Sequence, residues 1–536
     1  MSSNNWRESI NSPFTKGKSG AWISGSSLLR WFYGILVISC FILLMYLVQF
    51  STENLVGTDG YYHIKFASIM RLEGLKPEFP WLPLTILNPG EFADHHFLFH
   101  VFLIPFTFGN LIQGAKLASV LFASLAFMSI WWLLRNQKVS YAATWALGLL
   151  AISEAFLYRM SMPRVQSLSL AILVLGLNFL LIRKYIFLIP LSFIYVWMYD
   201  AFPLLVVLTL LYILAIWIIE RRLVLQPLFY VLFGISLGLL INPYFPHNIV
   251  FFLRHLSPKL IGSDAVRVGN EWYPYETSQL LKNSPLTLIF FLSGVVALGL
   301  SNRRMDSRTA TALFLAIFFG LLLFQARRFI EYFPPFVLIF AAFAWDPVLT
   351  SVNNKKLGSS TDNLSPPVSD RNKLIDATLK RSWLVGAMLA AIMLAGIWRT
   401  TRDAQQTIME STPTNRYSRA SEWLKANTPQ STRIFQTDWD DFPRLFFHNT
   451  HNTYLIGLDP TYLYLKEPAL YDLWVEITQG KEANPSGAIF NIFAAEYAFT
   501  DTSHDSFIDQ AQKDPGLEEV YKDEEAIIFR VAHIEQ

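Results

Sequence analysis

Long apolar runs separated by short polar turns fill the chain from residue 28 to residue 399. A run of about 18 or more apolar residues can cross the roughly 30 Å hydrocarbon core of a membrane as a helix. Charged residues make up only 16% of the 536 residues, whereas soluble domains average about a quarter. We therefore expect a polytopic α-helical membrane protein with about eleven spans.

The formal charge and the cysteine count exclude two classes of function. The net charge of +2 is too small to indicate a nucleic-acid partner. The chain has one cysteine, Cys40, so it can form neither an intrachain disulfide nor a cysteine metal cluster.

Lysine and arginine in short loops stay on the cytoplasmic side, and they orient the chain. Arg7, Lys16 and Lys18 place the N-terminal tail in the cytoplasm. We expect a multi-pass plasma-membrane protein, and an outer domain without disulfides favours a bacterial membrane. The expected domains are a cytoplasmic tail 1–27; a transmembrane part 28–399 with outer loops 51–113 and 242–285 and a cytoplasmic loop 346–381; and an extracytoplasmic domain 400–536.

Two apolar stretches of the transmembrane part carry specific expectations. Phe97–Phe108 is short and contains Pro105, which predicts a helix lying on the outer surface rather than a span. A full span there would reverse the sidedness of every later loop. Tyr141–Tyr158 is long enough to be a single span.

The C-terminal part has a soluble composition and mixed local patterns. Arg433–Gln436 and Tyr454–Gly457 are predicted strands, and Pro468–Gln479 is a predicted helix with one apolar face. Val520–Val531 has the pattern of a hairpin. These patterns predict a small α/β domain.

A single acid, Asp59, follows the first apolar run in the sequence Thr58-Asp59-Gly60-Tyr61-Tyr62-His63. A carboxylate at the membrane surface can act as a general base, or it can bind a divalent cation that neutralises a phosphate leaving group. It can also be an ordinary solvated loop charge. A helix through this stretch would place His63 on the same face as Asp59.

Histidines gather in the sequence Asp94-His95-His96, with His100 four residues after His96. On a helix, His96 and His100 share one face at a spacing that suits a metal ion. Packed or interfacial histidines are the alternative, and they are the commoner case.

Arginines occur where the orientation predicts outer turns, at Arg159, Arg164, Arg327 and Arg328. Positive charge outside runs against the usual bias, and the phosphate of a lipid-linked donor is a natural partner, because guanidinium binds phosphate bidentately. The alternatives for Arg327 and Arg328 are pairing with Glu331 or reaching lipid headgroups.

Two further outer segments carry acids next to aromatic residues. Glu271 lies in Asn270-Glu271-Trp272-Tyr273, which is typical of a segment at the membrane interface. Trp439, Asp440 and Asp441 follow a predicted strand. They can form a recognition surface, a Ca²⁺ or Mg²⁺ site, or a turn whose acids cap a helix.

Taken in order, these motifs resemble the catalytic subunits of oligosaccharyltransferases, which are membrane glycosyltransferases of the GT-C class. Asp59 with Tyr62-His63 is similar to the first acidic motif of that family, and Glu271 to the glutamate of its large outer loop. Arg328 is similar to its donor-phosphate arginine, and Trp439-Asp440 to the start of its Trp-Trp-Asp acceptor motif.

The sequence departs from the family at two of its motifs. After Arg164 it has Val165-Gln166-Ser167, where the family has an acidic pair, and the acceptor motif lacks its second tryptophan, its tyrosine and its glycine. The first departure removes expected ligands of a metal ion. The second removes residues expected to recognise an asparagine acceptor.

The resemblance implies a transferase that moves a sugar or glycan from a polyprenyl phosphate or pyrophosphate donor to a polysaccharide, lipid or protein acceptor outside the membrane. A transporter or flippase of lipid-linked intermediates and a non-catalytic scaffold are the alternatives. A divalent cation, Mg²⁺ or Mn²⁺, would need ligands other than the missing pair. The residues implied are Asp59 and Glu271 for catalysis; Arg328, Arg164 and Arg159 for the donor phosphate; Trp439, Asp440 and Asp441 for the acceptor; and Asp59, His95 and His96 for the cation.

Overall fold

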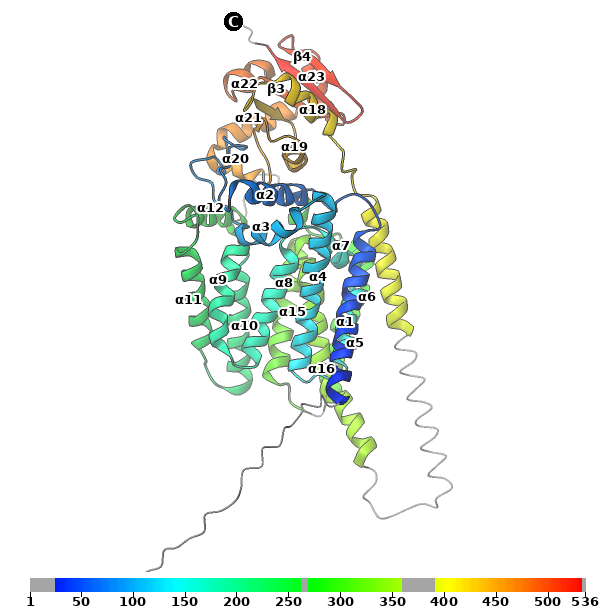
Figure 1. Cartoon of the computed structure of the whole chain (residues 1–536). Helices are drawn as coiled ribbons and strands as arrows, with labels where there is room; N and C mark the ends of the chain where they lie inside the picture. The colour runs from blue at the N-terminus through cyan, green and yellow to red at the C-terminus, as the bar shows by residue number, and fades with distance from the viewer. Residues whose placement is uncertain (1–24, 262–268, 302, 359–390, 533–536) are drawn as a thin grey trace, which may run out of the picture.

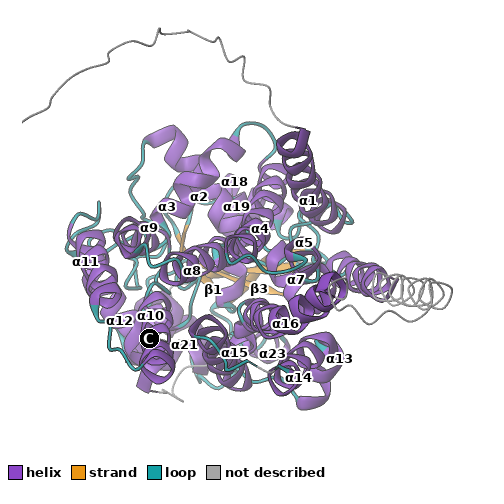
Figure 2. Ribbon diagram, turned by 90° about the horizontal axis from the view of Figure 1, so that it is seen from below, coloured by secondary structure: helices purple, strands orange, loops and turns teal. Residues whose placement is uncertain are grey.

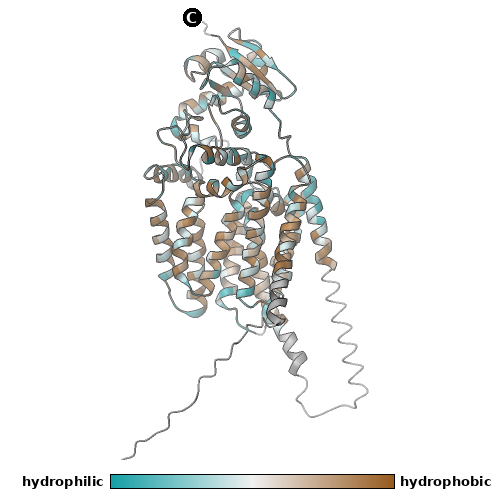
Figure 3. Ribbon diagram, viewed as in Figure 1, coloured by the Kyte–Doolittle hydropathy of each residue, from teal (hydrophilic) through white to brown (hydrophobic). Residues whose placement is uncertain are grey.

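The computed structural model describes residues 25–261, 269–301, 303–358 and 391–532. A bundle of upright helices carries a layer of helices across one end, called the capped end here, and a small α/β domain lies beyond that layer (Figure 1). Apolar residues dominate the bundle and polar residues are frequent in the α/β domain (Figure 3). The principal bundle helices are α1 (Gly25–Gln49), α4 (Leu111–Asn136), α8 (Gln166–Leu181), α9 (Leu188–Met198), α10 (Pro203–Glu220), α11 (Gln226–Leu240), α14 (Pro285–Leu300), α15 (Ser307–Gln325) and α16 (Phe333–Gly358).

Seen along the bundle, α4 and α8 lie inside it, whereas α11 and α14 lie at its edges (Figure 2). Within the described residues, four helices are long and apolar enough to cross a membrane, and up to six if two sharply bent helix pairs each count as one span. The expected count of eleven is therefore not confirmed. The fold is nevertheless mostly helical with a small C-terminal sheet, as expected.

The expected single span Tyr141–Tyr158 is wrong, because the chain is broken there into α5 (Ala142–Leu147), α6 (Leu149–Ile152) and α7 (Glu154–Ser161). Ser153 has an extended backbone, and its hydroxyl accepts a hydrogen bond from the backbone N–H of Phe156, which starts a new helix. Hydropathy alone does not detect such a cap.

The expected cytoplasmic loop 346–381 is helical at its start, because α16 continues to Gly358. Asp346 accepts hydrogen bonds from the backbone of Ser140 and from Arg308, so its charge is compensated inside the helical bundle. The remainder of that loop, from residue 359, lies outside the described residues. A further helix covers residues 391–409 and passes the expected end of the transmembrane part at 399.

The layer at the capped end consists of short helices that lie across the bundle (Figure 1). Phe97–Phe108 forms no full-length span but a short helix that continues directly into a 3-10 helix, in line with the expected short helix. The members of the layer are α2 (Asp59–Glu73), α3 (Phe97–Leu103), the 3-10 helix η1 (Ile104–Thr107) and α12 (His247–Ile261).

The C-terminal domain has a five-stranded sheet in the order β2-β1-β3-β5-β4. Strand β1 runs parallel to β2 and β3, whereas β5 is antiparallel to β3 and β4. The expected strand Arg433–Gln436, the helix Pro468–Gln479 and the hairpin Val520–Val531 are present. The expected strand Tyr454–Gly457 is wrong after Tyr454, because β2 covers only Thr453–Tyr454, and the patterns missed α20 and α23. The elements are α18 (Ser418–Asn427), β1 (Arg433–Gln436), α19 (Phe442–His448), β2 (Thr453–Tyr454), α20 (Thr461–Lys466), α21 (Pro468–Thr478), α22 (Pro485–Asn491), β3 (Tyr497–Asp501), α23 (Asp505–Ala511), β4 (Leu517–Lys522) and β5 (Ala526–Val531).

A shared aromatic core joins the C-terminal domain to the capped end. Phe446 of α19 is fully buried, and its ring lies 4.9 Å from that of Trp81 and 5.6 Å from that of Tyr62 in α2. The backbone N–H of Tyr454 also donates a hydrogen bond of 2.8 Å to the carbonyl of Trp81. This core fixes the start of the domain against the helix that carries Asp59.

Candidate functional site

A cavity of about 670 Å³ lies at the capped end, between the bundle, the helix layer and the C-terminal domain. Charged and polar side chains from α2, from the loop before α8 and from the segments around Glu271 and Arg328 line one part of it. Another part is apolar. That apolar part includes Val165, Leu204, Val207, Phe252, Leu322 and Phe329.

The first helix turn of α2 approaches the loop before α8 closely. A Cβ atom on Gly60 would come within 2.1 Å of the Pro163 ring, so only glycine allows this approach. The neighbouring Asp59 carboxylate then lies 3.0 Å from the Arg164 guanidinium. Burial raises the pKa of the Asp59 carboxyl, and Arg164 opposes this rise in part.

Glu271, in the 3-10 helix η3 (Asn270–Trp272), is the centre of the charge cluster. Its carboxylate lies 2.9 Å from Arg159, 3.1 Å from Arg164 and 3.6 Å from Arg328. Burial acts to raise the pKa of Glu271, but the three guanidiniums outweigh it and hold that pKa well below its usual range. The three arginines assigned to phosphate from sequence therefore converge on one anionic group.

Arg328 lies in the 3-10 helix η4 (Arg327–Glu331) between α15 and α16. Its Nη2 donates a 2.8 Å hydrogen bond to the Tyr199 hydroxyl, and its guanidinium stacks 4.2 Å from the Trp272 ring centroid. Such stacking fixes the plane of a guanidinium that binds an oxyanion.

Glu331 is not the ion-pair partner of Arg327 or Arg328, which was one alternative from the sequence. The buried Glu331 carboxylate instead accepts a 2.7 Å hydrogen bond from Nε of Arg159. Arg327 donates to the carbonyl of Pro274 and lies over Tyr275. Sequence spacing could not reveal the pair Arg159–Glu331, because its members lie 172 positions apart.

The Trp439 turn borders the same region from the C-terminal domain. Thr58, the neighbour of Asp59, donates a 2.9 Å hydrogen bond to the Asp440 carboxylate. Burial and the Asp59 charge raise the pKa of Asp440 to about 6. The Trp439 ring lies against Gly269, close to Glu271 in sequence, whereas Asp441 is buried and turns toward Tyr417.

The histidines are packed around the cavity rather than gathered around one point. His95 stacks on Phe251, and His96 stacks on Tyr199. In the described part of the chain, no group of three histidine, cysteine or acidic side chains is arranged to hold a metal ion. Asp59, His95 and His96 therefore do not form a complete ligand set with one another, because Asp59 engages Arg164 and the two imidazoles engage rings.

Gln166 occupies the region where the motif resemblance leads one to expect an acidic pair. It lines the cavity, its side chain is buried, and its Oε1 has no hydrogen-bond partner among the described residues. A neutral amide at this position can accept a hydrogen bond but contributes no charge to a cation site.

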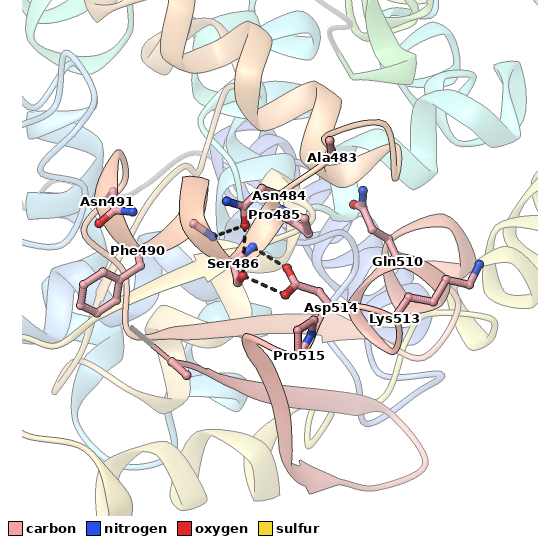
Figure 4. Close-up of a pocket in the computed structure, with 12 residues that line it drawn as sticks. Ala483, Asn484, Pro485, Ser486, Phe490, Asn491, Gln510, Lys513, Asp514 and Pro515 are labelled. Atoms are coloured by element: carbon pink, nitrogen blue, oxygen red, sulfur yellow. Dashed lines mark hydrogen bonds between the residues drawn. The ribbon is translucent and has the colours of Figure 1, made fainter. Parts of the chain in front are cut away.

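A second cavity, of about 490 Å³, lies in the C-terminal domain between α22, α23 and β5 (Figure 4). The Asp514 carboxylate in it accepts hydrogen bonds from the backbone and the hydroxyl of Ser486. This carboxylate is thus used to hold the domain together.

No family model matches the chain, and no curated protein matches its sequence. Solved structures do match its fold. The apo oligosaccharyltransferase of Archaeoglobus fulgidus has a TM-score of 0.63 and 13% identity, over 89% of this chain and 70% of that one. ArnT of Cupriavidus metallidurans bound to undecaprenyl phosphate has a TM-score of 0.55 and 15% identity, over 93% and 97%.

The arabinofuranosyltransferase AftD from Mycobacteria has a TM-score of 0.55 and 12% identity, over 95% of this chain and 40% of that one. The three neighbours are GT-C glycosyltransferases, and the resemblance expected from the motifs is confirmed at the level of the fold. At these identities the likeness concerns the fold alone.

Proposed function

We propose that the protein transfers a sugar or glycan from a polyprenyl phosphate or pyrophosphate donor to an acceptor at the outer face of a membrane. The observation that carries this proposal is the convergence of Arg159, Arg164 and Arg328 on the carboxylate of Glu271 beside an apolar cavity wall. Guanidiniums arranged around one anion suit a phosphate, and the apolar wall suits the first part of a lipid tail. That ArnT holds undecaprenyl phosphate in the same fold supports the assignment.

Binding of the donor phosphate would change the partner of Asp59, the proposed general base. Arg159 keeps Glu331 as a partner, so Arg164 and Arg328 supply the guanidiniums for the phosphate. When a phosphate engages Arg164, the Asp59 carboxylate loses that partner and is free to accept a proton.

The reaction then has a simple balance. The acceptor hydroxyl or amine gives its proton to Asp59 and attacks the anomeric carbon of the sugar. The bond from that carbon to the phosphate oxygen breaks, and the electron pair leaves with the polyprenyl phosphate, which the arginines stabilise. Trp439, Asp440 and Asp441 border the side from which an acceptor would approach, and Glu271 would help to exclude water.

The divalent cation stays a prediction, and no step above is routed through it. Donor turnover measured with a chelator present tests it directly. A transporter or flippase is not favoured, since the structural neighbours are transferases.

The adjacent arginines provide a matched test. Purified protein would receive undecaprenyl phosphate carrying a radiolabelled sugar, and release of undecaprenyl phosphate would be measured. We expect Arg328→Ala to lower turnover by about 100-fold, because a charge-assisted contact to the leaving phosphate is lost. Arg327→Ala should change turnover less than about twofold, because Arg327 contacts Pro274 and Tyr275 instead. Equal effects of the two variants would contradict the phosphate site.

A further inference from the structure

A continuous wall of aromatic rings leads away from Arg328 along the cavity. Tyr199, which accepts a hydrogen bond from Arg328, lies 5.4 Å from His96 between ring centroids. His96 is 4.1 Å from His95, and His95 is 6.0 Å from His255. We name this set the histidine wall: Tyr199, His63, His95, His96, His255 and Tyr462.

A buried chain of hydrogen bonds determines which ring nitrogen of His63 donates and which accepts. The Asp94 carboxylate, 1% exposed, lies 2.7 Å from Nδ1 of His100, whose Nε2 lies 2.8 Å from Nδ1 of His63. The carboxylate accepts, so Nδ1 of His100 donates, and when this is the one ring proton of His100 its Nε2 accepts. In that arrangement His63 donates from Nδ1, which leaves the lone pair of its Nε2 as an acceptor in a side chain that lines the cavity.

Asp94 also positions the other histidines of the wall. Its second carboxylate oxygen accepts a 3.0 Å hydrogen bond from the backbone N–H of His96, which shapes the turn that carries His95 and His96. One buried carboxylate therefore helps to position histidine rings from two separate elements, so the wall is held in place by hydrogen bonds as well as by packing.

The wall is uncharged at its centre and acidic at its far end. Burial lowers the pKa of His95 to about 4 and holds those of His63 and His96 well below their usual value. Asp200 lies 3.0 Å from His255, and Asp459 lines the same part of the cavity. Among the described lining residues, the arginines are those of the phosphate cluster, Arg164 and Arg328.

The geometry points to the histidine wall as the subsite for the donor sugar, where imidazole nitrogens and Oε1 of Gln166 accept hydrogen bonds from sugar hydroxyls. This inference rests on the proposed function, because a phosphate at Arg328 places the attached sugar against Tyr199 and His96. Rings and neutral acceptors suit an uncharged, hydroxyl-rich sugar. Asp200 and Asp459 oppose a sugar that carries a carboxylate, such as a uronic acid.

Binding measurements separate the sugar subsite from the phosphate site. The probes are undecaprenyl phosphate alone and the same lipid phosphate carrying glucose, galactose, mannose, N-acetylglucosamine or glucuronic acid. We expect at least one neutral sugar to bind about tenfold more tightly than the bare lipid phosphate, and glucuronic acid to bind more weakly than glucose.

Variants of the wall should act on the sugar alone. His63→Ala should weaken binding of the preferred neutral-sugar lipid by about fivefold and leave binding of bare undecaprenyl phosphate unchanged. Asp94→Asn alters the proton positions on His100 and His63, and Asp94 is thus a positioning residue. This variant should also weaken binding of the neutral-sugar lipid and leave binding of bare undecaprenyl phosphate unchanged. His504→Ala, in the C-terminal domain, is the matched histidine control.

The possible failures are distinguishable. If bare undecaprenyl phosphate binds and Arg328→Ala abolishes that binding, the phosphate site stands. Equal losses for bare and sugar-bearing lipid in His63→Ala, no gain from any neutral sugar, or equal binding of glucuronic acid and glucose would then overturn the sugar subsite alone. No binding of bare lipid at all would contradict the proposed function itself.

Discussion

Glu271 holds the position that a donor phosphate needs, and this gives a prediction at the scale of one residue. Its carboxylate contacts the same guanidiniums, so it competes with a bound phosphate. Removing its charge leaves the cluster more positive. We therefore expect Glu271→Gln to bind undecaprenyl phosphate about fivefold more tightly than the wild type while transferring sugar more slowly, measured by lipid titration and by turnover.

A nearby acid serves as the control for that prediction. Glu276 is exposed and belongs to the same segment, so Glu276→Gln should bind the lipid like the wild type. Weaker lipid binding by Glu271→Gln would mean that Glu271 supports the anion site rather than competing for it.

At this same scale the sequence identified residue types but not their partners. Asp59, Arg164, Arg328 and Glu271 were all predicted from sidedness and motif resemblance, and they meet at one cavity. The hydrogen-bond chain from Asp94 through His100 to His63 is not among the predictions, because the spacing of His96 and His100 suggests two ligands of one metal ion. Tautomers and partners depend on three-dimensional contact, which a spacing rule does not contain.

At the scale of elements, α19 packs the C-terminal domain against the capped end of the bundle. Phe446 is fully buried between rings of α2 and of the loop after it. Truncating such a phenylalanine costs about 3–5 kcal/mol. We expect Phe446→Ala to lower the unfolding temperature by several degrees and to lower turnover, because Asp440 would no longer be held beside Thr58. Thermal unfolding followed by tryptophan fluorescence measures the first effect.

The control for that variant is a phenylalanine of the bundle, Phe324, which is 64% exposed. Phe324→Ala leaves no buried cavity and should change the unfolding temperature little. An equally small effect of Phe446→Ala would show that the domain does not depend on this core for its position.

Helix α19 shows where element prediction stays ambiguous. Its buried residues Phe442, Leu445 and Phe446 follow a helical spacing, and proline at the first helical positions is compatible with a helix start. The sequence leaves a capped helix open there, because the acids before Phe442 fit a helix cap, a recognition surface and a cation site alike.

At the scale of the whole molecule, hydropathy predicted that the chain is a helical membrane protein, but not how its helices bend. The helices α7 and α8 meet at 109° around the segment that carries Pro163 and Arg164. An outer turn is expected there from the sequence, but the close approach of Gly60 in α2 to Pro163 is not, because it joins segments about 100 positions apart. Arg164, which follows Pro163, contacts Asp59 at 3.0 Å. The turn itself is thus predictable from the sequence, whereas the contacts that it makes with α2 are not.

The distribution of charge along the bundle leads to a prediction about the membrane orientation of the whole chain. Helix α10 begins at the cavity and its 18 residues extend about 27 Å to the opposite end of the bundle. Basic residues gather at that opposite end, and the positive-inside rule therefore predicts that this end is the cytoplasmic one. They are Arg135, Lys138, Arg183, Lys184, Arg221, Arg222, Arg303, Arg304 and Arg308.

The single cysteine makes this orientation simple to test. In a Cys40→Ser background, Asp509→Cys in α23 and Arg222→Cys beyond α10 introduce one exposed thiol each, at opposite ends of the molecule. A membrane-impermeant maleimide should label Asp509→Cys in intact cells, whereas Arg222→Cys should be labelled only after permeabilisation. The reverse labelling pattern would place the proposed phosphate site, with Arg164 and Arg328, on the cytoplasmic side of the membrane. The acceptor would then have to be a cytoplasmic molecule rather than an extracytoplasmic one.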